Sequence, residues 1–424
     1  MPKTRVVVGI DIGSSKVTTI IATLADSQVN IIGVASATSR GLRKGQVVDI
    51  DETTGTITQS LEAAERMAGY SVGSAFVSVD GVHIESQNSK GVVAIGNPNG
   101  EIEEEDVLRV VEAARAISLP SSREILHVIP RYFVVDSQTG IKDPIGMNGV
   151  RLEVETHIIT GAATALRNIA KCVGAVGVDV AALVFAGLAS SYAVLTDTER
   201  ELGVVLIDFG GGTTDITIFT EGSPAYSSVL PVGARNVTND LAIGLRVSLE
   251  SAEKIKLALS TPPKVAVDVD ESGLPHDKKE SDQLDVAGLG IEDDLRQVSK
   301  KTLVDGIMKP RLREILNMAK IEIQKSALLG LTPSGVVLTG GGAATVGMVE
   351  LAKQELAMPV RIGLPGPATG LVDEVASPAY AASLGLVIHG AQYQQEELRL
   401  PLIGRIEVKN VVGKGISWIK SLLP

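Results

Sequence analysis

Two segments of the chain share one pattern, and this duplication constrains the fold more than any other feature. One reads VVGIDIGSSK near the N-terminus and the other reads VLIDFGGGTT near the middle, so Asp11 is equivalent to Asp208 and Gly13 to Gly210. In each, a β-branched run ends in the aspartate, a turn of glycines or small hydroxyl residues follows, and a second β-branched run begins. The pattern predicts a strand–turn–strand unit that occurs twice.

The chemistry of the two turns favours phosphate groups beside a metal ion. Glycines and small hydroxyl residues let backbone N–H groups approach a phosphate closely, and an aspartate beside them can hold a divalent cation through its water shell. We therefore expect a nucleotide between two related halves. The candidate phosphate-binding residues are Gly13, Ser14, Ser15, Lys16, Gly210, Gly211, Gly212, Thr213 and Thr214, and the candidate metal-holding residues, through water, are Asp11 and Asp208.

Two other phosphate-binding motifs are excluded by the residues that follow the glycines. A Walker loop needs Gly-Lys-Ser or Gly-Lys-Thr at the start of a helix, and a dinucleotide-binding fold needs GxGxxG there. Neither motif is present, and both turns run into β-branched segments. One such turn alone is equally compatible with an ordinary tight turn, so the prediction depends on the pair and on a third motif.

The third motif is an apolar strand that ends in three glycines, VVLTGGGA at residues 336–343. Residues without Cβ let the backbone lie flat against a base or ribose, although a strand-to-helix turn leading into a helix over 343–356 is an alternative. Glu253 and Lys256 share one face of an expected helix, where they can reach ribose hydroxyls or form an exposed salt bridge. The candidate adenosine-binding residues are Glu253, Lys256, Gly340, Gly341 and Gly342.

In this order, the three motifs resemble those of the actin-like ATPase superfamily. The segment PVGARNVTNDLA at 231–242, followed by IGL at 243–245 and AEK at 252–254, is similar to the FtsA family of bacterial cell-division proteins. The similarity runs from about Val6 to Gly390. It implies an α/β fold, namely an actin-like two-lobe ATPase fold with an FtsA-type small α/β subdomain inserted in the first lobe. It also implies ATP and Mg²⁺ as ligands, with Gly233 among the adenosine-binding residues.

The motifs and the resemblance together divide the chain into parts. We expect ordered helices at Leu241–Leu259 and Val298–Lys325, and a solvated acidic loop at Asp270–Asp282. The expected parts are the first lobe at 1–81 and 160–198, the inserted subdomain at 82–159, the second lobe at 199–390 with an upper subdomain at about 240–310, a linker at 391–410 and an amphipathic membrane-targeting helix at 411–424.

The resemblance also implies a cellular role. A protein of this family self-assembles at the inner membrane face, tethers FtsZ filaments to the membrane and helps to recruit later divisome proteins, which we assign to the inserted subdomain. The C-terminal peptide of FtsZ is expected on the upper part of the second lobe. The candidate contacts for this peptide, which could otherwise be ordinary solvated side chains, are Lys300, Lys301, Lys309 and Arg311.

One departure from the wider superfamily bears on catalysis. In filament-forming and chaperone relatives, a Glu or Gln on the helix that links the lobes orients the attacking water, and the resemblance places Ala186 of the expected helix Leu183–Tyr192 there. Alanine has no hydrogen-bonding side chain, so the positional advantage for phosphoryl transfer is lost. We expect slow ATP hydrolysis at most, and a shifted alignment brings Ser190 or Ser191 there, which are poor bases.

Composition limits the remaining possibilities. A formal net charge of −11 argues against nucleic-acid binding, and the five histidines have no spacing of metal ligands. The single cysteine, Cys172, rules out an internal disulfide, fits a reducing cytoplasm and is expected to be buried. No run of about 18 apolar residues is present to span a bilayer. The first strand follows the N-terminus so closely that a signal sequence is not expected.

The last residues form an amphipathic pattern. At helical spacing, apolar side chains fall on one side of residues 411–424 and polar ones on the other, which is typical of a helix in a membrane interface. A last helix packed on its own domain is the alternative. The candidate residues for an anionic membrane are Val412, Lys414, Ile416, Trp418, Ile419, Lys420, Leu422 and Leu423. With the resemblance, they predict a peripheral protein on the cytoplasmic face of the cell membrane, at the division site.

Two other functions remain as alternatives to this adaptor. A sugar kinase of the same superfamily has no use for an amphipathic tail, and no second aspartate motif marks a base for a sugar hydroxyl. A pilus-assembly relative of FtsA would bind ATP without division partners. The tail and the segment Thr238–Asp240 favour the division protein over the pilus relative.

Overall fold

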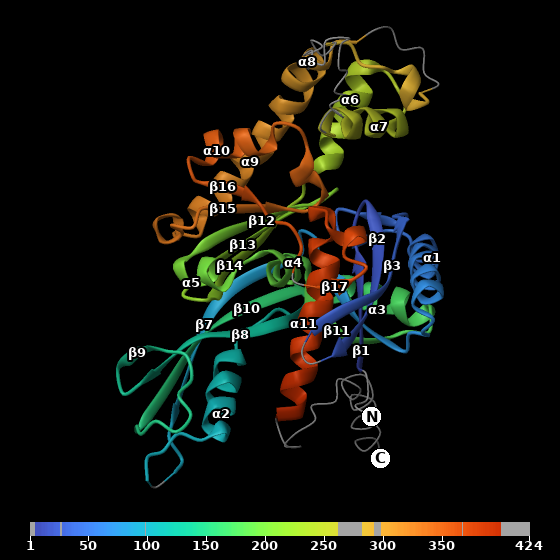
Figure 1. The fold of residues 1–424 in the computed structure, drawn as a ribbon. Helices are drawn as coiled ribbons and strands as arrows, with labels where there is room; N and C mark the ends of the chain where they lie inside the picture. The colour runs from blue at the N-terminus through green and yellow to red at the C-terminus, as the bar shows by residue number, and fades with distance from the viewer. Residues whose placement is uncertain are drawn as a thin grey trace, which may run out of the picture.

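Two sheets with the same strand order carry the two hairpins in the computed structural model (Figure 1). Three antiparallel strands are followed by two parallel ones, in the orders β3-β2-β1-β6-β11 and β14-β13-β12-β15-β16. Both predicted strand–turn–strand units are confirmed. The structure describes residues 5–25, 28–97, 99–261, 282–291, 298–366 and 368–399.

The strands are runs rich in valine, isoleucine and threonine, as expected for buried pleated segments. The first sheet consists of β1 (Arg5–Ile12), β2 (Lys16–Ala25), β3 (Gln28–Thr38), β6 (Ser74–Val79), β11 (Asp179–Phe185) and β17 (Thr369–Gly370). The second consists of β12 (Val204–Phe209), β13 (Thr214–Thr220), β14 (Ser223–Leu230), β15 (Val336–Thr339) and β16 (Val360–Ile362). A small separate hairpin consists of β4 (Leu42–Arg43) and β5 (Gln46–Val47).

Helix α1 (Ile50–Ala68) packs on the first sheet, and the local sequence explains both of its ends. The side chain of Asp49 accepts a hydrogen bond from a backbone N–H of the first turn, which caps the helix start. Gly69 ends the helix in the left-handed conformation, with a φ of 62°. The apolar side chains that recur at helical spacing and enter the core are Ile57, Leu61 and Ala64.

The chain returns to the first lobe near its C-terminus. Strand β17 pairs with β3, and α11 (Ala381–Arg399) packs on β1 and on α4 (Ala186–Val194). The packing on α4 is close, because a Cβ on Gly385 of α11 would lie 1.8 Å from the Ala189 carbonyl. The structure therefore places residues 369–370 and 381–399 with the first lobe, whereas the second lobe was expected up to 390 and a linker from 391; the rest of that linker, 400–410, lies outside the described residues. Helix α3 (Ala163–Ala175), with buried Cys172, also belongs to this lobe, whereas α5 (Asp197–Leu202) contacts β13 of the second lobe.

A third sheet lies below the second lobe and to the left of the first lobe in Figure 1, and it has the order β7-β10-β8-β9. It consists of β7 (Glu85–Ala94), β10 (Arg151–Ala162), β8 (Arg123–Val135) and β9 (Gln138–Ile141), with α2 (Glu104–Arg115) on one face. A Cβ on Gly91 would lie 2.1 Å from the Val110 carbonyl, so glycine is what allows α2 to pack directly on β7. The helix and the sheet enclose a small separate core that includes Val110, Leu152 and Val154.

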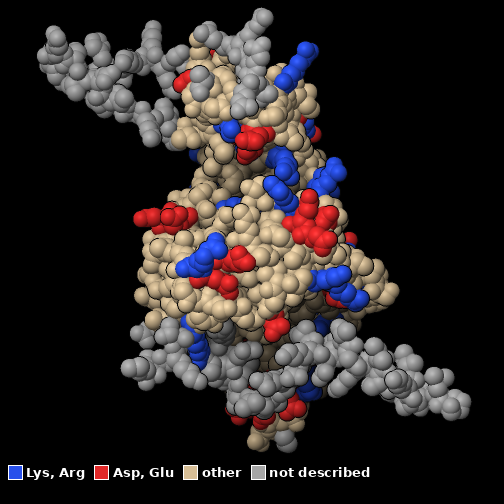
Figure 2. All heavy atoms as spheres, turned by 90° about the vertical axis from the view of Figure 1, so that its right-hand side faces the viewer, with Lys and Arg blue, Asp and Glu red and all other residues tan. Residues whose placement is uncertain are grey.

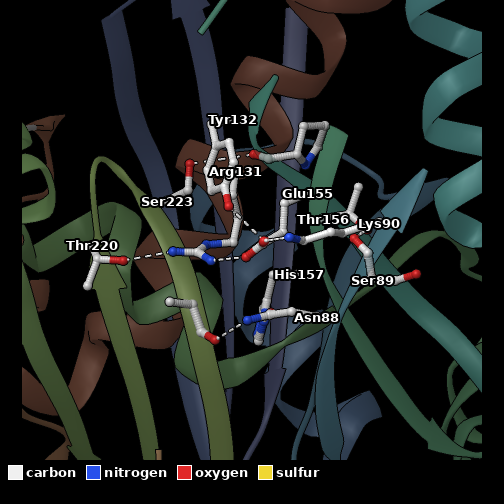
Figure 3. A network of polar contacts seen from close by, with 12 residues as sticks. Asn88, Ser89, Lys90, Arg131, Tyr132, Glu155, Thr156, His157, Thr220 and Ser223 are labelled. Carbon is white, nitrogen blue, oxygen red and sulfur yellow. Dashed lines mark hydrogen bonds and ion pairs between the residues drawn. The ribbon is translucent and has the colours of Figure 1, made fainter. Parts of the chain in front are cut away.

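Buried polar side chains join this third sheet to β14 and the end of β13 (Figure 3). His157 is fully buried between Asn88 (2.7 Å) and the Ser227 hydroxyl (3.0 Å). Burial lowers the pKa of His157 to about 3, so the ring stays neutral. Arg131 pairs with Glu155 and donates to the Thr220 hydroxyl at 2.9 Å. The junction therefore fixes the third sheet against the second lobe by hydrogen bonds.

The upper part of the second lobe consists of helices, and one expected helix is wrong. The range Leu241–Leu259 contains the end of one helix and most of another, because Arg246 adopts the left-handed conformation with a φ of 59° and ends the first. The range Val298–Lys325 is helical from Lys300, with a π-helical turn inside it. The elements here are α6 (Ala234–Leu245), α7 (Leu249–Ser260), α8 (Lys300–Leu303), the π turn Val304–Met308, α9 (Lys309–Lys325) and α10 (Met348–Leu356).

Several expectations concern residues outside the described part of the chain. They are the tail at 411–424 with its membrane-binding candidates and nearly all of the acidic loop Asp270–Asp282. Among the described helices, none is long and apolar enough to cross a membrane. Figure 2 shows the face that carries α1, where acidic and basic side chains are interspersed.

Candidate functional site

A cavity of about 420 Å³ lies where the two hairpin turns meet. Its walls come from the turn after β1, the turn after β12, the glycine loop after β15, helix α7 and the start of α11. The structure thus brings together the three motifs that the sequence singled out. The predicted residues that line the cavity are Asp11, Gly13, Ser14, Ser15, Lys16, Asp208, Gly210, Gly211, Thr213, Glu253, Lys256, Gly340, Gly341 and Gly342.

Three of the predicted residues lie behind the cavity wall instead of on it. The Thr214 hydroxyl donates to the Val232 carbonyl at 2.8 Å, and a Cβ on Gly212 would lie 3.0 Å from the side chain of Ser14. A Cβ on Gly233 would lie 2.6 Å from the Gly210 carbonyl, so Gly233 supports the second turn from behind. A sequence pattern cannot separate ligand-facing from protein-facing residues in turns this tight.

The two turns are in direct contact with one another. A Cβ on Gly211 would lie 1.9 Å from the hydroxyl oxygen of Ser15, so only glycine fits at this position. The Ser14 hydroxyl accepts a hydrogen bond from the N–H of Gly45 at 3.0 Å, which holds the first turn against the loop between β4 and β5. The turns of the two halves therefore meet beside one small volume, which suits a polyphosphate that takes backbone N–H donors from both.

Asp11 and Asp208 sit at the two strand ends, where Asp208 is buried and Asp11 is half-buried. The Ser78 hydroxyl donates to Asp11 at 2.8 Å, and the Ser190 hydroxyl donates to Asp208. Burial raises the pKa of Asp11 above its ordinary value. Burial also raises the pKa of Asp208 to about 7, because water is excluded and the charges of Asp11 and Asp80 add to the effect, while Ser190 opposes it.

Two further carboxylates line the cavity, Asp80 and Asp215, and neither was among the residues predicted from the sequence. Asp215 lies directly opposite Asp208 in the β12–β13 register, so both side chains are on one face of the hairpin. The Thr213 hydroxyl donates to Asp80. A signal was present, because Asp80 directly follows an apolar strand and precedes a glycine, and Asp215 directly follows the second turn.

This set of oxygen donors fits a hydrated divalent cation. One oxygen of Asp215 is buried and makes no hydrogen bond within the described residues, and burial, with the nearby charge of Asp80, raises the pKa of this carboxyl well above its usual range. A divalent cation prefers oxygen ligands, and its positive charge would offset the repulsion between the negative charges of these carboxylates. Within the described part of the chain, no three acidic, histidine or cysteine side chains are grouped to hold a metal directly, so phosphate and water oxygens would supply most ligands.

The glycine loop after β15 closes the cavity beside Asp208. Gly340 has a φ of 81°, and a Cβ there would lie 2.2 Å from an oxygen of Asp208. A short 3₁₀ turn, Gly341–Ala344, follows, and α10 begins at Met348 instead of the Ala343 that the alternative assumed. The loop therefore lines the cavity and also leads into a helix, so both interpretations of this motif describe part of it.

Glu253 and Lys256 line the cavity and also form an ion pair at 2.7 Å. The pair is not an ordinary surface salt bridge, because Lys256 is buried and donates at 3.0 Å to the Thr238 hydroxyl. That hydroxyl in turn donates to Glu253 at 2.5 Å. The three side chains form a closed polar triangle at the cavity wall, on helices α6 and α7.

Ala186 lines the cavity at the first residue of α4. The expected helix Leu183–Tyr192 is wrong in its first three residues, which belong to β11 and pair with β6 because their apolar side chains suit a buried strand. The two serines considered as substitutes are engaged elsewhere: Ser190 donates to Asp208, and Ser191 donates to the Leu188 carbonyl at 2.6 Å.

The four residues predicted to contact the FtsZ peptide lie on α8 and α9, and none of them lines the cavity between the two hairpin turns. Arg311 is held by both oxygens of Asp240 at 2.6 and 3.0 Å, and Lys309 pairs with Asp305 at 2.7 Å. Lys300 and Lys301 begin α8, where the N–H of Lys301 donates to Asp282 at 2.9 Å. A second cavity of about 280 Å³ adjoins this region and is lined by Asp240, Gly306, Ile307, Pro310, Arg311 and Glu314.

The paired sheets and the cavity between their hairpins define an actin-like ATPase fold, and solved structures share it. A PilM–PilN type IV pilus biogenesis complex has a TM-score of 0.60 at 16% identity, over 91% of this chain and 98% of that one. MreB5 of Spiroplasma citri bound to AMPPNP has a TM-score of 0.50 at 13% identity, over 94% of this chain and 98% of that one. At these identities the likeness is one of fold.

Sequence relatives are more specific. A family profile described as "Cell division protein FtsA" matches residues 205–385, and one described as "SHS2 domain inserted in FTSA" matches residues 81–160. Cell division protein FtsA of Pseudomonas aeruginosa is 39% identical over 94% of this chain and 93% of its own length. The relatives from Borreliella burgdorferi and Escherichia coli K12 are 40% and 36% identical, over 97% and 99% of this chain and 97% and 96% of their own lengths. The chain belongs to the FtsA family of cell-division proteins.

Proposed function

We propose that the chain is an ATP-binding adaptor that joins FtsZ filaments to the inner face of the cell membrane. The observation that carries this proposal is the cavity in which both hairpin turns and the glycine loop meet, in a chain of the FtsA family. MreB5 of Spiroplasma citri, which shares the fold, has been solved bound to AMPPNP, and this supports a nucleotide in the equivalent cavity. The cavity supports a nucleotide role, and family membership supports the division role.

In this proposal, the two turns hold the phosphates of ATP through backbone N–H groups and Lys16. Asp11 and Asp208 hold Mg²⁺ through its water shell, beside the phosphates. Glu253 and Lys256 face the ribose, and the loop Gly340–Gly342 packs on the adenosine. Because Ala186 brings no hydrogen-bonding side chain to the cavity, hydrolysis is slow or absent, and binding of ATP is the main event.

The partners follow from the other surfaces. We assign the FtsZ C-terminal peptide to α8 and α9, where Lys300, Lys301, Lys309 and Arg311 provide positive charge beside a small cavity. We assign later divisome proteins to the inserted subdomain and self-association to the lobes. The amphipathic segment at 411–424 would hold each copy on anionic lipid at the division site, and linked copies would bind far more stably than one.

Binding of Mg·ATP to Asp208→Ala tests the nucleotide half of the proposal. We expect the variant to lose measurable binding of a fluorescent ATP analogue, because the cation loses one of its two carboxylates. Asp179→Ala is the matched control, since Asp179 is an exposed aspartate at the start of β11, far from the turns. Equal affinities of the parent chain and Asp208→Ala would remove Asp208 from the site.

A further inference from the structure

Lys16 and Tyr380 are in direct contact beside the cavity. The ammonium nitrogen of Lys16 lies 3.3 Å from the centroid of the Tyr380 ring, which is a close cation–π geometry. Lys16 begins β2 in the first phosphate turn, and Tyr380 ends a 3₁₀ turn, Pro378–Tyr380, immediately before α11. The contact therefore joins two segments from opposite ends of the chain, and no sequence motif pointed to Tyr380.

The ring is the main partner of this ammonium group. Within the described residues, the Lys16 ammonium makes no hydrogen bond or ion pair. Burial lowers the pKa of Lys16 to about 8, and the negative charge of Asp11 opposes this effect. An ammonium that has lost part of its water is attracted to the face of an aromatic ring, so Tyr380 supplies the contact that fixes its position.

Tyr380 is itself held by the glycine loop on the other side of the cavity. The N–H of Gly340 donates to the Pro378 carbonyl at 3.1 Å, at the start of the turn that carries the ring. The N–H of Tyr380 donates to the Ser377 carbonyl at 3.0 Å, which closes that turn. The glycine loop therefore helps to fix the position of the Tyr380 ring through these hydrogen bonds. The contact between the ring and Lys16 then connects the glycine loop with the first phosphate turn.

We propose that Tyr380 is a positioning residue for the polyphosphate chain of the nucleotide, because its ring holds the ammonium group of Lys16, a residue of the first phosphate turn that lines the cavity. This inference rests on the proposed function, since it assumes that Lys16 meets phosphate. A triphosphate needs the Lys16 ammonium in its place, whereas adenosine has no phosphate for that ammonium to bind. The residue therefore determines affinity for phosphate and leaves recognition of the base and ribose unchanged.

Two substitutions in the full-length chain separate the ring from the hydroxyl. Tyr380→Leu removes the aromatic face but keeps an apolar side chain, and Tyr380→Phe keeps the face and removes a hydroxyl that makes no hydrogen bond within the described residues. We expect Tyr380→Leu to weaken Mg·ATP binding about tenfold, as loss of a partly desolvated cation–π contact should. Adenosine affinity, measured by competition, should stay within about twofold, and Tyr380→Phe should bind Mg·ATP like the parent chain.

A double-mutant cycle with Lys16→Met completes the test. If Tyr380 acts through Lys16, adding Tyr380→Leu to Lys16→Met should cause no further loss of Mg·ATP affinity. Additive losses would overturn the proposal, and so would a Tyr380→Leu variant with parental ATP affinity, a Tyr380→Phe variant as weak as Tyr380→Leu, or equal losses for ATP and adenosine. A parent chain that binds neither ligand would instead overturn the proposed nucleotide function.

Discussion

Gly340 lies so close to Asp208 that a Cβ atom at position 340 would be 2.2 Å from the nearer carboxylate oxygen. The loop that we assign to adenosine and the carboxylate that we assign to the cation are therefore packed against each other, with no room for a side chain between them. Gly340 also has a φ of 81°, which a residue with a Cβ rarely adopts, so backbone and space both favour glycine here.

Gly340→Ala should therefore weaken nucleotide binding strongly. The substitution adds about 1–2 kcal/mol of backbone strain and a contact that must displace Asp208. We expect at least about a tenfold loss of Mg·ATP affinity by fluorescence titration. Gly174→Ala is the control, since Gly174 lies in α3 with no atom within 4 Å of the added Cβ. Parental affinity of Gly340→Ala would contradict the packing role of this glycine.

Binding of Mg·ATP should depend on pH with a maximum between about pH 7 and about pH 8, where Asp208 is ionised and Lys16 is still protonated. As pH falls below about 7, protonation of Asp208 removes the charge that attracts the cation. As pH rises above about 8, Lys16 loses the charge that attracts phosphate. Titration from pH 5.5 to 9.5 checks this. A flat profile would contradict both assignments.

Phosphate release should be slow under the proposed function, because we assign Ala186 to the position from which relatives orient the attacking water. Ala186→Gln adds a hydrogen-bonding side chain at the first residue of α4, on the cavity wall. We expect single-turnover hydrolysis of bound ATP to rise about tenfold, with little change in ATP affinity. A parent chain with the steady turnover of an active kinase would show that another group positions the water.

Charge reversal on α8 should weaken binding of the FtsZ C-terminal peptide. The double substitution Lys300→Glu and Lys301→Glu should reduce affinity about fivefold, with a weaker dependence on salt, because charges at the rim of an interface act mainly through long-range attraction. Arg66→Glu on α1 is the control, since Arg66 is 73% exposed and remote from this surface. Unchanged peptide affinity in the double variant would remove both lysines from the contact.

The hairpins and the glycine loop were predictable because their signals are local. Asp11 and Asp208 mark strand ends, and glycines mark the turns, within about ten residues of sequence each. The break between α6 and α7 was not predictable, since Arg246 adopts a left-handed conformation that normally favours glycine or asparagine. Tertiary packing decides such a position, and a single sequence carries no record of it.

Long-range packing explains the remaining differences. The return of β17 and α11 to the first lobe depends on contacts such as that between Gly385 and Ala189, which join residues far apart in the chain. Asp215 was not predicted because its role depends on its position opposite Asp208 in the hairpin. Tyr380 was not predicted because it contacts Lys16, which lies at the other end of the sequence. Motifs identify the parts of the cavity, but topology decides which further side chains join them.

Sedimentation of a labelled FtsZ C-terminal peptide with anionic liposomes tests the adaptor account most directly. With the parent chain and Mg·ATP, the peptide should pellet with the liposomes, because one protein binds both and linked copies hold the membrane stably. Trp418→Glu places a charge in the apolar face of the tail and should leave both protein and peptide in the supernatant, while ATP binding is unchanged. A peptide that stays in the supernatant with the parent chain, or that pellets equally with Trp418→Glu, would contradict the account.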